Sequence, residues 1–341
     1  MANKIVCVTG GSGYLGSFLI KKLLEKGFTV HATLRNLGEE VKVRFLKSLP
    51  YADSRLVLFQ ADIYNPDEFA PAILGCHTVV HLATPLHHDH RSSLYKNTTE
   101  AALGGVKCIA ESCIKSGTVK RLVYTSSVVA ASPLKDDGSG FKDSMDETCW
   151  TPLNLSFPYT DNFKDAYVHS KTLSEKEVLR CNADGKLEVV SLACGLVGGD
   201  IIQPLLGDSL RVMISQFCKD KMRYGWLRFL EELIGKVPIV HIDDVASAFI
   251  FCIESDDQGL IGRFLCASDF VSTAEIASIL QTSCCLDDGD AIPDEFIEDT
   301  QREIKWSSSK LEERGFQYKY NAEMILQGSV KCFKKSQQNV Q

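Results

Sequence analysis

The chain has 341 residues, of which 45% are hydrophobic and 24% are charged, and its formal net charge is −7. These proportions exclude disordered and fibrous proteins, while the length allows a nucleotide-binding domain together with a second lobe. The net negative charge argues against nucleic acid as the main partner, because phosphate backbones are bound by basic faces.

Neither the apolar pattern nor the cysteines indicate a membrane or secreted protein. No apolar run approaches the roughly 18 residues of a membrane span, and the first eight residues lack a signal-peptide pattern. The 13 cysteines include no Cys-x-x-Cys, which is typical of reduced thiols. We therefore expect a cytoplasmic protein, and we expect a monomer or a weak dimer that acts on a small molecule.

Strand-like and helix-like segments alternate through the first half of the chain. The predicted strands are 4–9, 29–33, 56–59, 78–81 and 121–125, and the predicted helices are 14–26, 67–74 and 97–116. Further on, the pattern predicts a helix over 167–181, a strand over 188–192, and helices over 273–280 and 322–334. Alternation of buried strands with helices predicts an α/β fold with a Rossmann-type, doubly wound parallel sheet.

No linker separates the two expected parts of the chain, so we expect the smaller C-terminal substrate lobe to be interleaved with the first domain. The predicted dinucleotide-binding domain comprises residues 1–190 and about 236–255. The predicted substrate-binding lobe comprises about 191–235 and 256–341.

A glycine-rich turn, Gly10-Gly11-Ser12-Gly13, joins the first strand to the first helix. Gly10 permits the tight turn, Gly13 lets the backbone approach a pyrophosphate, and Gly16 lets the helix pack closely on the strand. The helix N-terminus adds unpaired N–H groups and the positive end of the helix dipole. In this strand–turn–helix context the glycines predict a dinucleotide site.

The residues after the second strand indicate which dinucleotide is bound. An acidic residue about 20 positions beyond the glycines selects NAD, but this chain has Arg35 there, with Lys42 and Arg44 shortly after. A guanidinium suits the 2′-phosphate of NADP, so we predict NADPH. Asp62, after the third strand, is a candidate acceptor for the adenine amino group, although a loop cap would use the same residue.

Tyr167 and Lys171 have the Tyr-x-x-x-Lys spacing, which places both side chains on one face of a helix. A neighbouring ammonium favours the phenolate, so such a tyrosine can exchange a proton with a carbonyl or an alcohol near neutral pH. Ser127 ends a buried strand about 40 residues upstream. Its hydroxyl is a candidate donor to a substrate oxygen that gains charge during hydride transfer.

Together these residues resemble the plant reductases related to dihydroflavonol reductase, anthocyanidin reductase and vestitone reductase, which are extended short-chain dehydrogenases. The similarity runs nearly from end to end. It rests on the glycine turn, on Val-His-Leu-Ala-Thr-Pro at 80–85, on Tyr-Thr-Ser-Ser at 124–127, on Tyr-Val-His-Ser-Lys at 167–171 and on Val-His-Ile-Asp-Asp at 240–244.

The resemblance implies an NADPH-dependent reductase of a carbonyl group on a bulky plant natural product. It implies that Ser127 orients the carbonyl, that Tyr167 donates the proton, and that Lys171 lowers the tyrosine pKa and contacts the nicotinamide ribose. The cofactor contacts that it implies are Thr9, Gly10, Gly13, Tyr14, Leu15, Gly16, Arg35, Lys42, Asp62, Ile63, Leu82, Ala83, Thr84, Thr125, Tyr167, Lys171, Ala193, Gly195 and Leu196.

Departures from the family pattern put the substrate in doubt. Where dihydroflavonol reductases carry an Asn that holds flavonoid hydroxyls, this chain has Ser132, which we expect to contact substrate together with Pro85 and Leu86. The segment His87-His88-Asp89-His90 also differs, and we expect a solvated or substrate-facing loop there and no metal site. Two alternatives remain open, an NAD-dependent sugar-nucleotide epimerase or dehydratase, and a non-catalytic dinucleotide-sensing protein.

Overall fold

The computed structural model describes the chain from residue 4 to residue 338, except for residues 157, 258, 285–290, 299 and 301. The chain divides into two compact units. Unit 1 comprises Met1–Ser126, Ala166–Leu192 and Ala246–Arg263, and unit 2 comprises Ser127–Asp165, Ala193–Val245 and Phe264–Gln341.

A seven-stranded sheet in the order β10-β7-β5-β4-β1-β2-β3 is the framework of unit 1. The pairs β1–β2, β1–β4, β2–β3 and β4–β5 are all parallel. This topology confirms the predicted Rossmann-type α/β fold. The strands are β1 (Ile5–Thr9), β2 (Thr29–Leu34), β3 (Leu56–Gln60), β4 (Thr78–His81), β5 (Arg121–Ser127), β7 (Glu188–Cys194) and β10 (Gly262–Cys266).

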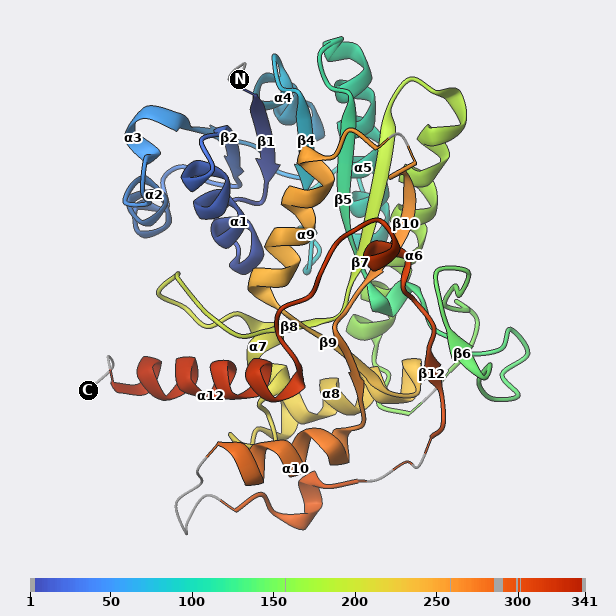
Figure 1. Ribbon diagram of the computed structural model, residues 1–341. Helices are drawn as coiled ribbons and strands as arrows, with labels where there is room; N and C mark the ends of the chain where they lie inside the picture. The colour runs from blue at the N-terminus through green and yellow to red at the C-terminus, as the bar shows by residue number, and fades with distance from the viewer. Residues whose placement is uncertain are drawn as a thin grey trace. The chain divides into compact units, whose positions relative to one another are not determined.

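Helices cover both faces of this sheet, as Figure 1 shows. Helices α4 (Ala70–Ile73), α5 (Thr98–Ser116) and α6 (Asn162–Arg180) share one buried apolar cluster with the strands. On the other face lie α1 (Tyr14–Glu25) and α9 (Ile242–Glu254), which are joined by a 3.0 Å bond from Lys22 Nζ to Ser247 Oγ. The remaining helices of unit 1 are α2 (Glu40–Lys47), α3 (Ala52–Arg55) and the 3₁₀ helices η1 (Pro66–Phe69) and η3 (Cys181–Asp184).

Unit 2 contains two smaller sheets. In the first, β9 (Val237–His241) pairs in parallel with β8 (Leu196–Gly198) and antiparallel with β11 (Asp269–Val271). In the second, β6 (Ser144–Met145) pairs in parallel with β12 (Lys305–Trp306). The helices are α7 (Asp208–Met213), α8 (Lys221–Ile234), α10 (Thr273–Ser283), α11 (Lys310–Glu313), α12 (Ala322–Gln338) and the 3₁₀ helices η2 (Val128–Ala130) and η4 (Asp294–Phe296).

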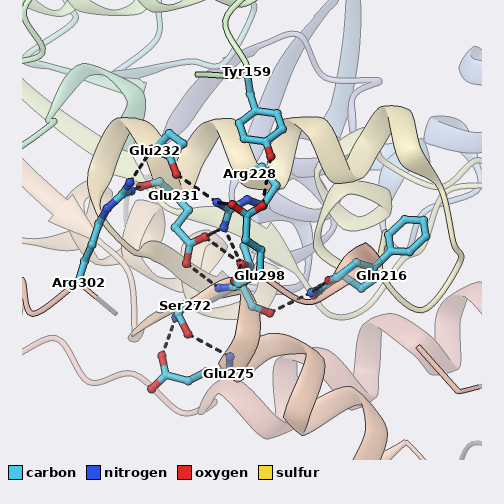
Figure 2. Close-up of polar contacts among 11 residues, drawn as sticks. Tyr159, Gln216, Arg228, Glu231, Glu232, Ser272, Glu275, Glu298 and Arg302 are labelled. Atoms are coloured by element: carbon cyan, nitrogen blue, oxygen red, sulfur yellow. Dashed lines mark hydrogen bonds and ion pairs between the residues drawn. The ribbon is translucent and has the colours of Figure 1, made fainter. Parts of the chain in front are cut away.

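A buried network of charges on α8 organises part of unit 2 (Figure 2). Arg228 and Glu231, both with fully buried side chains, form an ion pair, and Arg228 also lies 3.1 Å from carboxylate oxygens of Glu232 and Glu298. Arg302 completes the network through Glu232. These contacts join α8 to the loop after η4. The ion pairs also compensate the cost of burying the Arg228 and Glu231 charges, since buried charges are stable only when they are paired.

The observed units differ from the predicted domain ranges. Residues 127–165 were expected in the first domain but belong to unit 2, and the third segment of unit 1 is 246–263. The contacts of β6 with β12 explain the first difference, together with Glu147, which accepts hydrogen bonds from Leu265 N and Ser308 Oγ. These partners lie more than 100 residues away, so no local pattern shows them.

Candidate active site

The glycine turn adopts the geometry that its residues predict. Gly10 has a φ of +69°, and a Cβ there would lie 3.1 Å from the backbone of Ala83. The turn is held by Gly11 N donating to Thr33 O at 2.9 Å and by Gly13 N donating to Gly10 O at 3.1 Å. Gly16 packs against Gly10 O so closely that a Cβ would overlap it. The glycine turn therefore leads directly into the N-terminus of α1. No acidic side chain lies in the first helical turn of α1.

A cavity of about 420 Å³ lies beside this turn in unit 1. Its lining includes eleven of the predicted cofactor and substrate residues, which are Gly10, Gly13, Arg35, Lys42, Asp62, Ile63, Leu82, Ala83, Thr84, Pro85 and Leu86. The cavity thus runs along the ends of β1, β2, β3 and β4. Ligands of open α/β sheets bind at this edge. Thr9 ends β1, and Tyr14, Leu15 and Gly16 form the first turn of α1 beside the cavity.

The basic side chains expected at the 2′-phosphate both line the cavity, and an acidic one accompanies them. Arg35 is exposed, and Lys42 Nζ lies 2.5 Å from a carboxylate oxygen of Glu39, which also lines the cavity. Sequence reasoning missed Glu39, although its position three residues before Lys42 is typical of a helical ion pair. A bound phosphate would compete with Glu39 for the Lys42 ammonium.

Asp62 is a loop cap and also lines the cavity. Its Oδ1 accepts a hydrogen bond from Tyr64 N at 3.1 Å, which makes it a loop cap. The residue is half-buried and belongs to the cavity lining, and its contact with the adenine amino group stays a prediction.

Lys171 is buried, and its ammonium is held at the ends of two strands. Its Nζ donates to Thr84 Oγ1 at 2.9 Å and to the carbonyl of Thr125 at 3.0 Å. Since Thr84 lines the cavity, the Lys171 ammonium adjoins the cavity through this threonine. Tyr167 is half-buried one helical turn before Lys171.

The orientation of α6 is set by a buried ion pair one turn beyond Lys171. Glu175 receives Arg263 Nη2 at 2.9 Å and Arg263 Nε at 3.1 Å, and Ser191 Oγ donates to it at 2.6 Å. Tyr167, Lys171 and Glu175 are spaced by four residues and therefore share one helical face. Anchoring Glu175 to β7 and β10 turns that face toward the sheet. Sequence reasoning missed this anchor.

Thr9 links the glycine turn to the end of β4. Its Oγ1 accepts from the backbone N–H groups of Leu82 at 3.0 Å and Ala83 at 3.1 Å, and it lies 2.8 Å from His81 Nδ1. Because both oxygen lone pairs are used, the hydroxyl hydrogen goes to Nδ1, and the imidazole proton must sit on Nε2. Burial, together with the Lys171 charge, lowers the pKa of His81 to about 3, so the ring is neutral.

The remaining predicted residues belong to unit 2. Ser127 ends β5, and its Oγ accepts a hydrogen bond from Val129 N at 3.3 Å. Gly195 donates its N–H to Cys266 O at 2.9 Å, and a Cβ at Gly195 would lie 2.7 Å from Pro238 O. A larger residue therefore cannot occupy this position between Ala193 and Leu196 without displacing the backbone of β9.

Comparison with known proteins identifies the family. Residues 6–267 match the model of the NAD dependent epimerase/dehydratase family. The chain belongs to this family.

Several plant enzymes of this family are similar to the chain over nearly its whole length. It is 35% identical to the vestitone reductase of Medicago sativa, with 96% of each chain covered. It is 32% identical to the dihydroflavonol 4-reductase of Callistephus chinensis, with 95% of this chain and 85% of that one covered. The crystal structure of vestitone reductase from alfalfa superposes with a TM-score of 0.77 at 32% identity, covering 98% of this chain and 99% of that one.

These matches confirm the predicted membership of the extended short-chain dehydrogenases and the prediction of an NAD(P)-dependent oxidoreductase. None of the helices in the described part of the chain has the length and apolar character needed to cross a membrane. The cytoplasmic location and the monomeric or weakly dimeric state stay predictions.

In this extended short-chain dehydrogenase, the structure does not support the predicted contact of Ser132 with substrate. Ser132 is fully buried, and its Oγ donates to Leu233 O at 2.5 Å and accepts from Leu134 N at 3.0 Å. The two hydrogen bonds of this hydroxyl therefore connect the segment after η2 to the end of α8.

The histidine segment forms a loop over the cavity wall. Tyr64 donates its hydroxyl to His87 O at 3.2 Å, His88 and His90 stack edge to face, and Asp89 pairs with Arg91 at 2.8 Å. Within residues that the structure describes, no group of three or more His, Cys, Asp or Glu side chains is arranged to hold a metal ion.

Proposed function

We propose that the protein is an NADPH-dependent reductase that converts a carbonyl group, or an equivalent electrophile, of a bulky multi-ring natural product of flavonoid, isoflavonoid or alkaloid type. The observation that carries the proposal is the Lys171 ammonium, which bonds to Thr84 in the cavity wall and lies one turn from Tyr167. In this proposal Tyr167 and Lys171 are the proton-transfer pair, and the cavity beside Thr84 holds the dinucleotide.

The cavity residues fit an NADP dinucleotide. The N-terminus of α1 suits the pyrophosphate, since it offers N–H groups and the positive end of the helix dipole, and the glycines of the turn let the backbone approach closely. Arg35 and Lys42 suit the 2′-phosphate, and Asp62 suits the adenine amino group. When bound, the reduced nicotinamide supplies a hydride to the carbonyl carbon.

The chain itself supplies orientation and the proton. Tyr167 gives its phenolic proton to the carbonyl oxygen as negative charge develops there, and the Lys171 ammonium stabilises the phenolate that remains. Ser127 donates a hydrogen bond to the same oxygen. The Lys171 ammonium donates to Thr125 O and Thr84 Oγ1, and these two bonds keep it in place throughout.

Two alternatives predict different behaviour of the purified protein. A sugar-nucleotide epimerase or dehydratase would retain its nicotinamide cofactor and show its absorbance after purification. A dinucleotide sensor would bind NADPH without turnover. Arg35 disfavours the first, and the set of Ser127, Tyr167 and Lys171 disfavours the second.

The test is NADPH oxidation with a panel of flavonoid, isoflavonoid, alkaloid and aldehyde substrates, with an assay lacking substrate as the control. We expect cofactor-free purified protein and substrate-dependent oxidation with at least one multi-ring ketone. NADPH binding without oxidation on any member of the panel would contradict the proposal and favour a sensor.

Replacing Arg35 tests the cofactor preference. Arg35→Asp removes a charge-assisted contact and adds repulsion to the 2′-phosphate, so we expect kcat/KM for NADPH to fall about 10- to 100-fold relative to NADH. The matched control is Arg44→Asp. Arg44 is on α2 outside the cavity lining, and it forms an exposed ion pair with Glu40 at 3.4 Å. An unchanged ratio in Arg35→Asp would mean that Arg35 is only a surface charge.

A further inference from the structure

Ser127 is followed at once by the tight turn η2, and a hydrogen bond inside this turn orients the serine. Val129 N donates to Ser127 Oγ at 3.3 Å. This contact uses a lone pair of the oxygen and leaves the hydroxyl hydrogen for an acceptor elsewhere. A serine that must donate to a substrate carbonyl needs this arrangement, so the position of the Val129 peptide matters to the chemistry.

Thr151 forms hydrogen bonds to two successive carbonyls of the turn, although it lies more than 20 residues further along the chain. Its Oγ1 donates to Val129 O at 2.6 Å, and its backbone N–H donates to Ala130 O at 3.1 Å. Ser132 N donates to the same Oγ1 at 3.0 Å. Carbonyls only accept and N–H groups only donate, so the direction of each bond is unambiguous.

Burial makes this arrangement rigid. Thr151 is 2% exposed, and Val129 and Ala130 are buried. If the Thr151 hydroxyl were removed, water could not take its place as the partner of Val129 O. A β-branched threonine also has a stiff χ1, which fixes where its hydroxyl points. The side chain is therefore a fixed support for the Val129–Ala130 peptide, which directly follows the Val128–Val129 peptide whose N–H holds Ser127.

We propose that Thr151 is a positioning residue that fixes the backbone of Val129 through its carbonyl and thereby aims the Ser127 hydroxyl, which is bonded to the Val129 N–H, at the substrate oxygen. This inference rests on the proposed reductase function. Thr151 itself touches neither substrate nor cofactor in this scheme.

The first test is a double-mutant cycle. Thr151→Val keeps the shape of the side chain and removes its hydroxyl, and we expect kcat to fall roughly tenfold with the KM for NADPH unchanged, because a displaced orienting group mainly costs turnover. Thr151→Ser should restore most of kcat. In a Ser127→Ala background the same Thr151→Val change should alter kcat less than about twofold, since coupled residues are not additive.

A structural control separates positioning from loss of stability. Ser329 is a buried hydroxyl of unit 2 that accepts from Gly199 N at 2.8 Å and donates to Ile325 O at 2.7 Å. Ser329→Ala should lower the melting temperature as Thr151→Val does, with kcat unchanged. If Thr151→Val lowers kcat by equal factors with and without Ser127, the inference is overturned while the reductase function stands.

A second measurement does not depend on turnover. Native-state hydrogen exchange at the Val129 amide should be at least tenfold faster in Thr151→Val than in the unmodified protein and slow again in Thr151→Ser, since fewer contacts hold the turn. Unchanged exchange at Val129 overturns the inference. If the unmodified protein reduces no carbonyl at all, the proposed function falls, and this exchange result alone decides whether Thr151 holds the turn.

Discussion

Tyr167→Phe should lower turnover on the order of 10²-fold or more, because it removes the group that supplies the proton as charge develops on the carbonyl oxygen. The ring itself remains, so the packing of α6 should be preserved. Lys171 keeps its bonds to Thr84 and Thr125, and those bonds do not involve the phenol. We therefore expect NADPH affinity to change little.

The measurement is kcat with the best substrate of the panel, together with the Kd of NADPH from fluorescence titration. Tyr51→Phe is the matched control, since Tyr51 is exposed beside α3 and lies outside the cavity lining. Near-normal turnover in a folded Tyr167→Phe variant would contradict the assignment of the proton donor. Lost NADPH binding would show instead that the phenol has a role in holding the cofactor.

The first half of the fold could be predicted because its information is local. The predicted strand 78–81 coincides with β4, and the predicted helix over 14–26 is α1 with one residue fewer. Parallel strands buried on both faces have continuous apolar runs, and the glycine turn marks the first crossover. The residues at the ends of these strands follow from that topology, which is why so many predicted contacts line one cavity.

Unit 2 could be predicted only in part. The predicted helices over 273–280 and 322–334 correspond to α10 and α12, but other elements depend on contacts between distant segments. The two-residue strands β6 and β12 have no periodicity to detect. Helix α8 is amphipathic but was not predicted, and its end is capped by Ser132 from 101 residues away. The family resemblance implied a substrate contact for Ser132, but it carried no information on the hydrogen bond from this hydroxyl to α8.

The same limit applies to charged residues inside the fold. No pattern in the sequence marks Glu175 and Arg263, yet both are buried and form a bidentate pair. The pair joins residues 88 positions apart, so only the tertiary structure shows that it orients the face carrying Tyr167 and Lys171.

Arg228→Met should destabilise unit 2 by about 3–5 kcal/mol, because it leaves the carboxylate of Glu231 buried with less compensation. Both side chains are fully buried, and Glu231 also accepts from Thr273 N at 2.9 Å. Burial already raises the pKa of Glu231 above its usual value, although Arg228 opposes that shift. All three tryptophans lie in unit 2, so their fluorescence during urea unfolding reports on this loss.

The destabilisation should depend on pH in a defined direction. Without Arg228 the pKa of Glu231 rises further above its unfolded value, so the folded variant binds a proton that the unfolded chain releases. Stability is then lost as the pH rises, and the difference between the unmodified protein and Arg228→Met should be larger at pH 8 than at pH 5.

Two further variants make this prediction specific to the buried pair. Adding Glu231→Gln to Arg228→Met should recover roughly half of the lost stability, since the unpaired charge is then absent. Lys221 is also on α8 and forms an exposed ion pair with Glu295 of η4 at 2.8 Å. Lys221→Met removes this pair and should cost less than about 1 kcal/mol. If Arg228→Met and Lys221→Met are equally mild, the network of Figure 2 contributes little to the stability of unit 2, and α8 is held by its apolar face alone.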